Sequence, residues 1–208
     1  MFLNTAVLLA FIPTFFFVSI TPGMCMTLSM SLGMTVGVRR TLWMMIGELA
    51  GVALVATSAV VGIAAVMLNF PLLFMAFKIV GGLYLAYLGV QLWRSKGKLA
   101  LAAMGEQQRQ ISRKDLVWQG FMTAIANPKG WAFFIALLPP FIDPAISMVS
   151  QLPALIAIIL LLEFVCLVIY ASGGKSLALL LKNQSNVKLI NRCAGTLMLG
   201  VGGWLIAS

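Results

Sequence analysis

Long apolar runs separated by short polar connections dominate the chain. A helix needs about 20 mostly apolar residues to cross a bilayer, so the runs predict six membrane-spanning helices. They lie near residues 5–35, 41–67, 72–93, 116–141, 153–173 and 188–207. The pattern therefore predicts an all-α integral membrane protein. In the third segment, Lys78 leaves only 15 uncharged residues before Arg94, so Lys78 either lies within the membrane or extends its ammonium group outward.

Composition leads to the same class of protein. Of the 208 residues, 62% are hydrophobic and only 9% are charged, with a mean hydropathy of +1.05, whereas soluble domains carry about 25% charged residues. A soluble domain is therefore excluded. Residues 1–38 carry no charge and lack the basic start of a cleaved signal peptide, which predicts a retained first span.

Basic residues fall almost entirely in alternate connections. Twelve of the 14 Lys and Arg lie between spans one and two, three and four, or five and six, and none lies near residues 69–71 or 143–153. Because basic loops stay in the cytoplasm, both termini are predicted outside. This placement accounts for the excess positive charge, so no nucleic-acid partner is expected.

A polar linker divides the chain into two related halves. We expect the linker at residues 94–115, with one three-helix repeat at 1–93 and another at 116–208. The segment from Gly81 to Gly89 matches the segment from Gly195 to Gly203 at a constant offset of 114 positions. Because each half has an odd number of spans, the second must insert upside down, as in inverted-repeat transporters.

Two prolines interrupt spans one and four. Thr21 precedes Pro22, and Asn127 precedes Pro128; Thr and Asn favour the N-cap and Pro the first helical position. Each proline thus predicts a helix start near the bilayer centre, which is tolerated only inside protein or beside a wet cavity. The exposed N–H groups of such starts suit a carboxylate. The predicted substrate-binding residues are Thr21, Pro22, Gly23, Asn127, Pro128 and Lys129.

Two acidic residues lie within spans. Glu48 and Glu163 are 115 positions apart, in spans two and five, and buried charges of this kind mark proton relays, ion sites or cationic substrate groups. A substrate with an ammonium and a carboxylate group would suit both sets of residues. The alternative is purely structural, with ion pairs such as Glu163–Lys129 or Lys78–Glu48 and prolines that only kink helices. Tyr170 either helps to bind substrate or anchors span five at the interface.

Other site types have little support. The chain has three cysteines, no CxxC pair and no histidine, so no metal or other cofactor is expected. A membrane thiol-electron carrier would need reactive cysteines beside both prolines, and only Cys25 lies near one. A structural membrane protein without transport would leave the prolines and glutamates without a role. Gly81, Gly82 and Gly89 form a small-residue face on which a helix, including one of a second copy, can pack closely.

The chain contains Pro22-Gly23, Ala-Asn-Pro-Lys-Gly at 126–130 with Leu-Pro-Pro-Phe at 138–141, and the glycine-containing segment from Tyr84 to Trp93. Together these motifs resemble those of the LysE/RhtB family of bacterial amino-acid exporters. The resemblance covers essentially the whole chain. It implies a carrier, not an enzyme, that exports amino acids or derivatives across the inner membrane, driven by the proton gradient.

The resemblance also refines the expected site. Likeness to homoserine and threonine exporters favours a small neutral substrate. The resemblance implies that members of the family often carry an acidic residue where Glu48 lies, and that some carry one where Glu163 lies. The family usually has Pro-Gly-Pro in span one, whereas the third position here is Met24, so the first half-helix is less rigidly specified.

Overall fold

A computed structural model describes residues 5–69, 71–94, 111–138, 141–142 and 146–207. Within these ranges the chain forms eight α-helices and no strand. The helices are α1 (Thr5–Ile20), α2 (Met24–Thr35), α3 (Val38–Asn69), α4 (Pro71–Arg94), α5 (Arg113–Ile125), α6 (Pro128–Leu137), α7 (Met148–Lys182) and α8 (Gln184–Ala207). The predicted all-α class is confirmed.

The helices coincide closely with the apolar runs. Helices α1 and α2 together cover the first run, with a bend of 57° between Phe11–Ile20 and Met24–Thr35. Helices α5 and α6 cover most of the fourth run and are separated at Ala126 and Asn127. The fifth run was predicted to end at residue 173, but α7 continues to Lys182. Its direction changes at Gly174, whose backbone angles (φ 37°, ψ −121°) are not helical.

Two described helices are long and apolar enough to cross a membrane: Val38–Gly62 in α3 and Val149–Gly174 in α7. The bent pair α1–α2 is a third if it forms one broken span. A membrane-spanning all-helical protein follows from these segments. The larger number of six spans remains a prediction.

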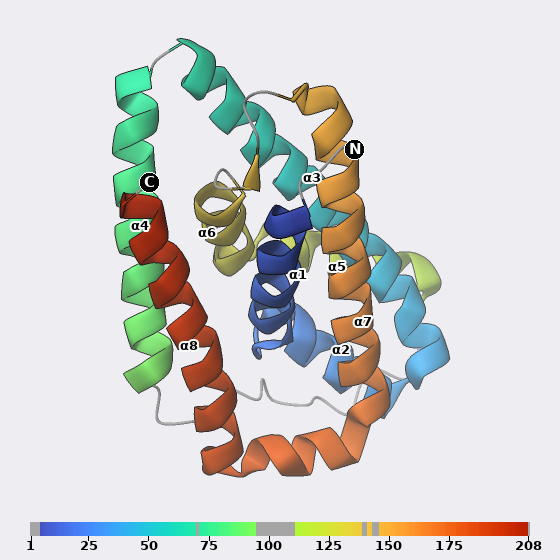
Figure 1. Cartoon of the computed structure of the whole chain (residues 1–208). Coiled ribbons are helices and arrows are strands. Elements are labelled where there is room, and N and C mark those ends of the chain that lie inside the picture. Colours follow the sequence, from blue (N-terminus) through green and yellow to red (C-terminus); the bar gives the residue numbers. More distant parts are fainter. Residues whose placement is uncertain (1–4, 70, 95–110, 139–140, 143–145, 208) are drawn as a thin grey trace.

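Helices α1 and α6 lie at the centre of the molecule, and α4 and α8 run antiparallel along one edge (Figure 1). Trp93 of α4 donates a hydrogen bond from Nε1 to Thr196 Oγ1 of α8 at 3.0 Å, and the Arg192 guanidinium lies 5.2 Å from the Trp93 ring centre. A Cβ added to Gly89 would lie 2.8 Å from the Gly195 carbonyl oxygen. At Gly89, the predicted small-residue face therefore packs against α8 of the same chain.

Glycines bring α3 and α5 into backbone contact. A Cβ added to Gly47 would lie 1.8 Å from the Val117 carbonyl oxygen, and one added to Gly120 would lie 2.0 Å from the Met44 carbonyl oxygen. These distances leave no room for any larger side chain. Since α3 carries Glu48 and α5 leads into the break at Asn127, this packing fixes one wall of the site described below.

Substituting Gly47 by Ala is expected to reduce the yield of folded protein sharply, because the helices must separate to admit the methyl group; overpacking typically costs about 1–3 kcal/mol. The matched control is Gly62→Ala on the same helix, where no atom lies within 4 Å of the added Cβ. Thermal melting of both variants in detergent measures the difference. Equal melting temperatures would contradict the close contact of α3 and α5.

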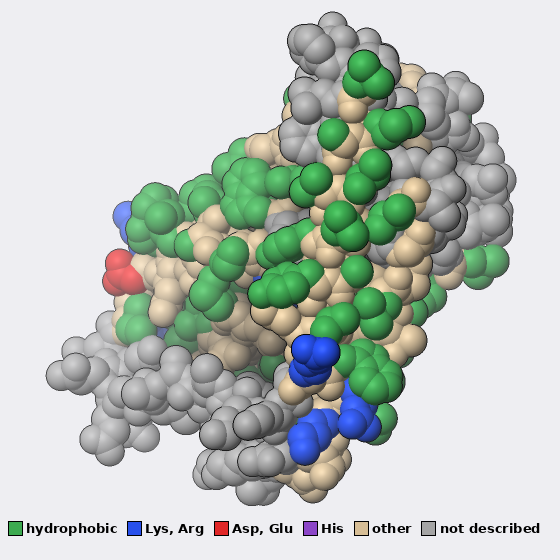
Figure 2. Space-filling model, turned by 90° about the vertical axis from the view of Figure 1, so that its left-hand side faces the viewer, with side chains coloured by type: hydrophobic (Ala, Val, Ile, Leu, Met, Phe, Trp, Pro, Cys, Tyr) green, Lys and Arg blue, Asp and Glu red, His purple; other side chains and the backbone are tan. Residues whose placement is uncertain are grey.

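Apolar side chains cover the outer face of the α4–α8 pair, with basic side chains near one end (Figure 2). On α4 the residues more than half exposed include Leu72, Met75, Val80, Leu83 and Tyr87. Such a large apolar surface is expected where lipid is the solvent.

The buried core consists of two clusters. One is rich in aromatic and aliphatic residues such as Phe11, Phe15 and Phe134. The other is rich in sulfur-containing residues and includes Met30, Met44 and Cys166. A cavity lies between them, since its lining residues come from both clusters.

Candidate functional site

The cavity lies where the α1–α2 and α5–α6 breaks approach α3 and α7. Its volume is about 50 Å³, enough for a few water molecules. Its lining residues are Phe15, Val18, Ser19, Thr21, Gly23, Cys25, Met26, Glu48, Val52, Val55, Ala124, Asn127, Lys129, Gly130, Phe133, Phe134 and Glu163. The walls are therefore mostly apolar, with polar groups concentrated at the two breaks and at the two glutamates.

The structure brings most of the predicted site residues together. Those that line the cavity are Thr21, Gly23, Glu48, Asn127, Lys129 and Glu163. Pro22 lies within the α1–α2 break and Pro128 is the first residue of α6, but neither lines the cavity; Tyr170 lies in the neighbouring core. The side chain of Lys78 lies outside the described residues, as do linker residues 95–110.

Helix α6 begins as the sequence predicts. Asn127 is the N-cap, and its Oδ1 accepts a hydrogen bond from the Lys129 N–H at 3.2 Å, with Pro128 in the first turn. The Asn127 amide also donates to Cys25 Sγ at 3.6 Å. This side chain therefore joins the start of α6 to the first turn of α2.

Helix α2 begins two residues later than predicted. Its N-cap is Gly23, in extended conformation and without a side-chain cap; Thr21 is not the N-cap and Pro22 is not the first helical residue. Thr21 remains attached to α1, because its Oγ1 donates to the Phe17 carbonyl at 2.6 Å and its N–H to the Val18 carbonyl at 3.3 Å. The first turn of α2 thus faces the cavity region with backbone N–H groups that no side chain caps.

Lys129 reaches from α6 to the end of α1. Its Nζ donates to the Val18 carbonyl at 2.9 Å and to the Thr21 carbonyl at 3.1 Å, and lies 5.8 Å from the Phe133 ring centre. The last carbonyls of a helix have no partner within it, so this ammonium group satisfies the Thr21 carbonyl that the break sets free, and it is a second donor to the Val18 carbonyl, which also accepts from the Thr21 N–H. Lys129 is also close enough to Glu163 for their charges to interact, but the described contacts include no direct ion pair between them.

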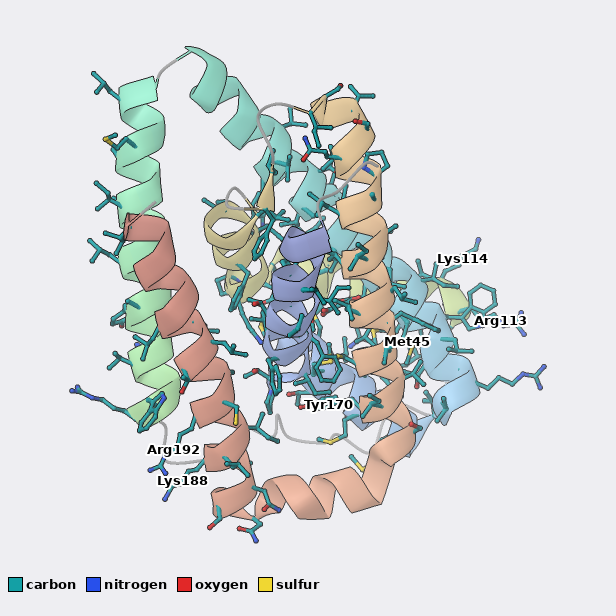
Figure 3. All side chains as sticks on the ribbon, viewed as in Figure 1. Met45, Arg113, Lys114, Tyr170, Lys188 and Arg192 are labelled. Carbon is teal, nitrogen blue, oxygen red and sulfur yellow. The ribbon has the colours of Figure 1, made fainter. Side chains whose placement is uncertain are left out.

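Tyr170 has a related role on α7. Its side chain is buried and its hydroxyl donates to the Ile20 carbonyl at 2.8 Å, pointing inward toward the α1–α2 break (Figure 3). Tyr170 is therefore not an anchor at the membrane surface. Together with Lys129 it ties the broken end of α1 to α6 and α7.

The two glutamates approach each other from α3 and α7. Glu48 is completely buried, and neither carboxylate oxygen has a hydrogen-bond partner; its close electrostatic neighbours are Glu163 and the Cys25 thiol. Glu163 is only partly buried and lies near Ser19. Unpaired carboxylates are costly in an apolar interior, and a proton or another cation beside the pair would lower this cost.

Sequence reasoning missed several cavity residues. Ser19 is a polar residue within an apolar run, two positions before Thr21. Its closeness to the predicted break was the one sequence feature that could have indicated a place in the cavity wall. Cys25 was set apart in the sequence only by its place near Pro22, and its thiol lies beside Glu48 and Asn127. Phe133 and Phe134 carry no signal that distinguishes them from lipid-facing aromatic residues. No group of three or more metal-ligating side chains occurs among the described residues.

The whole-chain comparison identifies the family. The sequence model of the family of LysE type translocators matches residues 15–208. The chain belongs to the LysE type translocator family. This confirms the resemblance to LysE/RhtB proteins that the sequence motifs indicated, and it makes the chain a member of a family of membrane translocators.

Proteins of several other bacteria are similar to this chain over nearly their whole length. A homoserine/homoserine lactone efflux protein of Salmonella typhimurium is 27% identical over 199 residues, covering 96% of this chain and 95% of that protein. An uncharacterized membrane protein of Vibrio cholerae serotype O1 is 27% identical over 93% of both chains. The membrane protein YrhP of Bacillus subtilis is 28% identical over 94% of this chain and 96% of its own length. No solved structure matches this chain.

Proposed function

We propose that this translocator exports small neutral amino acids or their derivatives, such as threonine or homoserine, from the cytoplasm in exchange for protons. The observation that carries the proposal is the cavity at the two helix breaks, which gathers Glu48, Glu163 and Lys129 from three helices. Intramembrane acidic residues beside broken helices are typical of substrate and coupling-ion sites. The relative from Salmonella typhimurium, whose name states homoserine and homoserine lactone efflux, supports the substrate class.

In this proposal the substrate lies with its amine toward the two glutamates. Its carbonyl or carboxyl oxygen faces the first turn of α2, where Gly23 leaves backbone N–H groups uncapped, a favourable site for an oxygen acceptor. Lys129 and Tyr170 hold the end of α1 in place. A proton from the external side then replaces the amine on the carboxylate pair and returns the carrier to its starting state.

The two halves of the chain would work as inverted repeats, with boundaries at 1–93, 94–115 and 116–208. The antiparallel arrangement of α4 and α8 supports this symmetry (Figure 1), as does the approach of Glu48 and Glu163 from corresponding helices. We place the protein in the bacterial inner membrane with both termini outside, following the distribution of basic residues. Alternating access would then consist of rocking one half against the other around the cavity.

An export assay tests the proposal. Cells with and without the protein are loaded with a panel of amino acids and dipeptides, and intracellular concentrations are followed with the proton gradient intact or collapsed. We expect the intracellular concentration of threonine or homoserine to fall faster in cells that carry the protein. This difference between the strains should disappear when the proton gradient is collapsed. If no compound differs between the strains, the exporter assignment is refuted; a difference that survives collapse would refute proton exchange.

A further inference from the structure

Basic side chains gather at one end of the α4–α8 pair. Arg94 is the last residue of α4, and Lys188 and Arg192 lie near the start of α8; all three are exposed. Because the two helices run antiparallel, the end of α4 lies beside the start of α8 (Figure 1). Lys188 and Arg192 are four positions apart, so they project from the same side of α8, as Figure 3 shows.

Trp93 holds one of these basic groups in place. Its ring N–H donates to Thr196 Oγ1 at 3.0 Å, which fixes the indole against α8. The Arg192 guanidinium lies over this ring, 5.2 Å from its centre, at a distance where the cation and the ring attract each other. No described residue accepts a hydrogen bond from this guanidinium. Arg192 is therefore positioned, and its N–H groups are open to a ligand from outside.

Neither helix supplies a negative charge to this cluster. Helices α4 and α8 contain no Asp or Glu, and none occurs between Glu48 and Glu106 or after Glu163. Of the acidic residues that the structure describes, Glu48 and Glu163 line the cavity and Asp115 caps α5. The anion that balances Arg94, Lys188 and Arg192 is thus expected to come from outside these two helices.

The surface beside the cluster is apolar (Figure 2). Leu83, Tyr87 and Val90 of α4 are exposed there, and on α8 Leu199 continues the side that carries Arg192 and Thr196. A surface of this kind is expected to face hydrocarbon. A ligand that matches both parts has an anionic head and apolar chains, whereas a free anion would leave the apolar part uncovered.

We propose that this end of the α4–α8 pair binds an anionic phospholipid. Arg192 and Lys188 hold the lipid phosphate, Arg94 adds positive charge, and the acyl chains lie along the apolar face of the pair. Basic clusters at the ends of membrane helices are suited to such headgroups. The site requires that α4 and α8 span the membrane, as the sequence predicts, but it does not depend on amino-acid export. The proposed orientation places it in the cytoplasmic leaflet.

A second arginine–tryptophan pair provides a matched control. Arg113 of α5 lies over the Trp43 ring, 5.4 Å from its centre, and Lys114 follows it in the chain; both basic residues are exposed. Asp115 lies in the same first turn of α5, so a carboxylate of the protein balances part of this positive charge. Replacing two basic residues by Gln at either place changes the net charge of the protein by the same amount.

The test uses the full chain in a neutral detergent, to which dioleoyl phosphatidylglycerol or dioleoyl phosphatidylcholine is added. Native mass spectrometry counts the bound lipid molecules. We expect phosphatidylglycerol to bind at least about tenfold more tightly than phosphatidylcholine, and the Lys188→Gln, Arg192→Gln double variant to lose about tenfold in affinity for phosphatidylglycerol. The Arg113→Gln, Lys114→Gln double variant should lose less than about threefold. Inorganic phosphate at the lipid concentration should displace no lipid.

Equal affinity for the two lipids, or equal losses in the two double variants, would overturn the proposal, because binding would then reflect only the apolar surface or the overall charge. Displacement of the lipid by inorganic phosphate would show a site for free anions instead of a lipid site. If the Lys188→Gln, Arg192→Gln protein does not fold, Arg192→Gln alone carries the test, with an expected loss of about threefold. Unchanged affinity in that single variant would also overturn the proposal.

Discussion

Replacing Glu48 by Gln is expected to abolish export while leaving the protein at least as stable as the original. Export should fall at least about 100-fold, since removing the counter-charge of a buried cation costs about 3–5 kcal/mol. Stability should not fall, because the amide is cheaper to bury than a carboxylate whose oxygens both lack partners. Export rates in cells and thermal melting in detergent measure the two effects.

Asp115→Asn is the control for Glu48→Gln. Asp115 is an exposed carboxylate that forms the capping box of α5 with Ser112. It does not line the cavity. We expect unchanged export and a loss of stability of at most about 1 kcal/mol. If Glu48→Gln exports at the original rate, the carboxylate pair is not the coupling site. If that variant instead unfolds, Glu48 is structural.

Replacing Lys129 by Met is expected to lower both export and stability. The substitution keeps an unbranched side chain but removes the ammonium group that donates to the Val18 and Thr21 carbonyl oxygens. A buried acceptor left without its donor costs about 1–3 kcal/mol, so we expect about 2 kcal/mol less stability. The end of α1 then loses its fixed position beside the cavity, and export should drop with it.

The control is Lys114→Met, which removes an exposed basic side chain that points away from the molecule at the start of α5 (Figure 3). It should change neither property. A Lys129→Met protein that melts and exports like the original would show that the hydrogen bonds to α1 contribute nothing. Lys129→Arg keeps donors and charge, so its stability should lie between that of the Lys129→Met variant and that of the original protein.

Local signals explain which parts of the fold could be predicted. The helices follow from the apolar runs, and the start of α6 follows from Asn127-Pro128, since a capping side chain and a proline at the first position act within a few residues. The start of α2 did not follow the same rule. There, hydrogen bonds from Thr21 back to Phe17 and Val18 kept Thr21 with α1, a competition that a motif does not reveal.

The site itself was only partly visible in the sequence. Glu48 and Glu163 could be predicted because a carboxylate is costly in an apolar span. The partners of Lys129 and Tyr170 could not, since both reach carbonyls more than 100 positions away, and only the folded chain brings these together. For Cys25 the sequence showed only that it lies near Pro22, not that its thiol lines the cavity beside Glu48. The kink at Gly174 was also missed, because a single glycine in a chain with many glycines does not indicate a change of helix direction.

The central claim is that substrate passes through the cavity between the two breaks, and the native Cys25 thiol in its wall tests this most directly. In a Cys166→Ala, Cys193→Ala protein, the rate at which a small thiol reagent labels Cys25 is measured with and without the amino acid or derivative that the export assay identifies. We predict that this compound slows labelling several-fold, whereas a compound that is not exported leaves the rate unchanged. Equal labelling rates at saturating substrate, in a protein that still exports, would contradict the account.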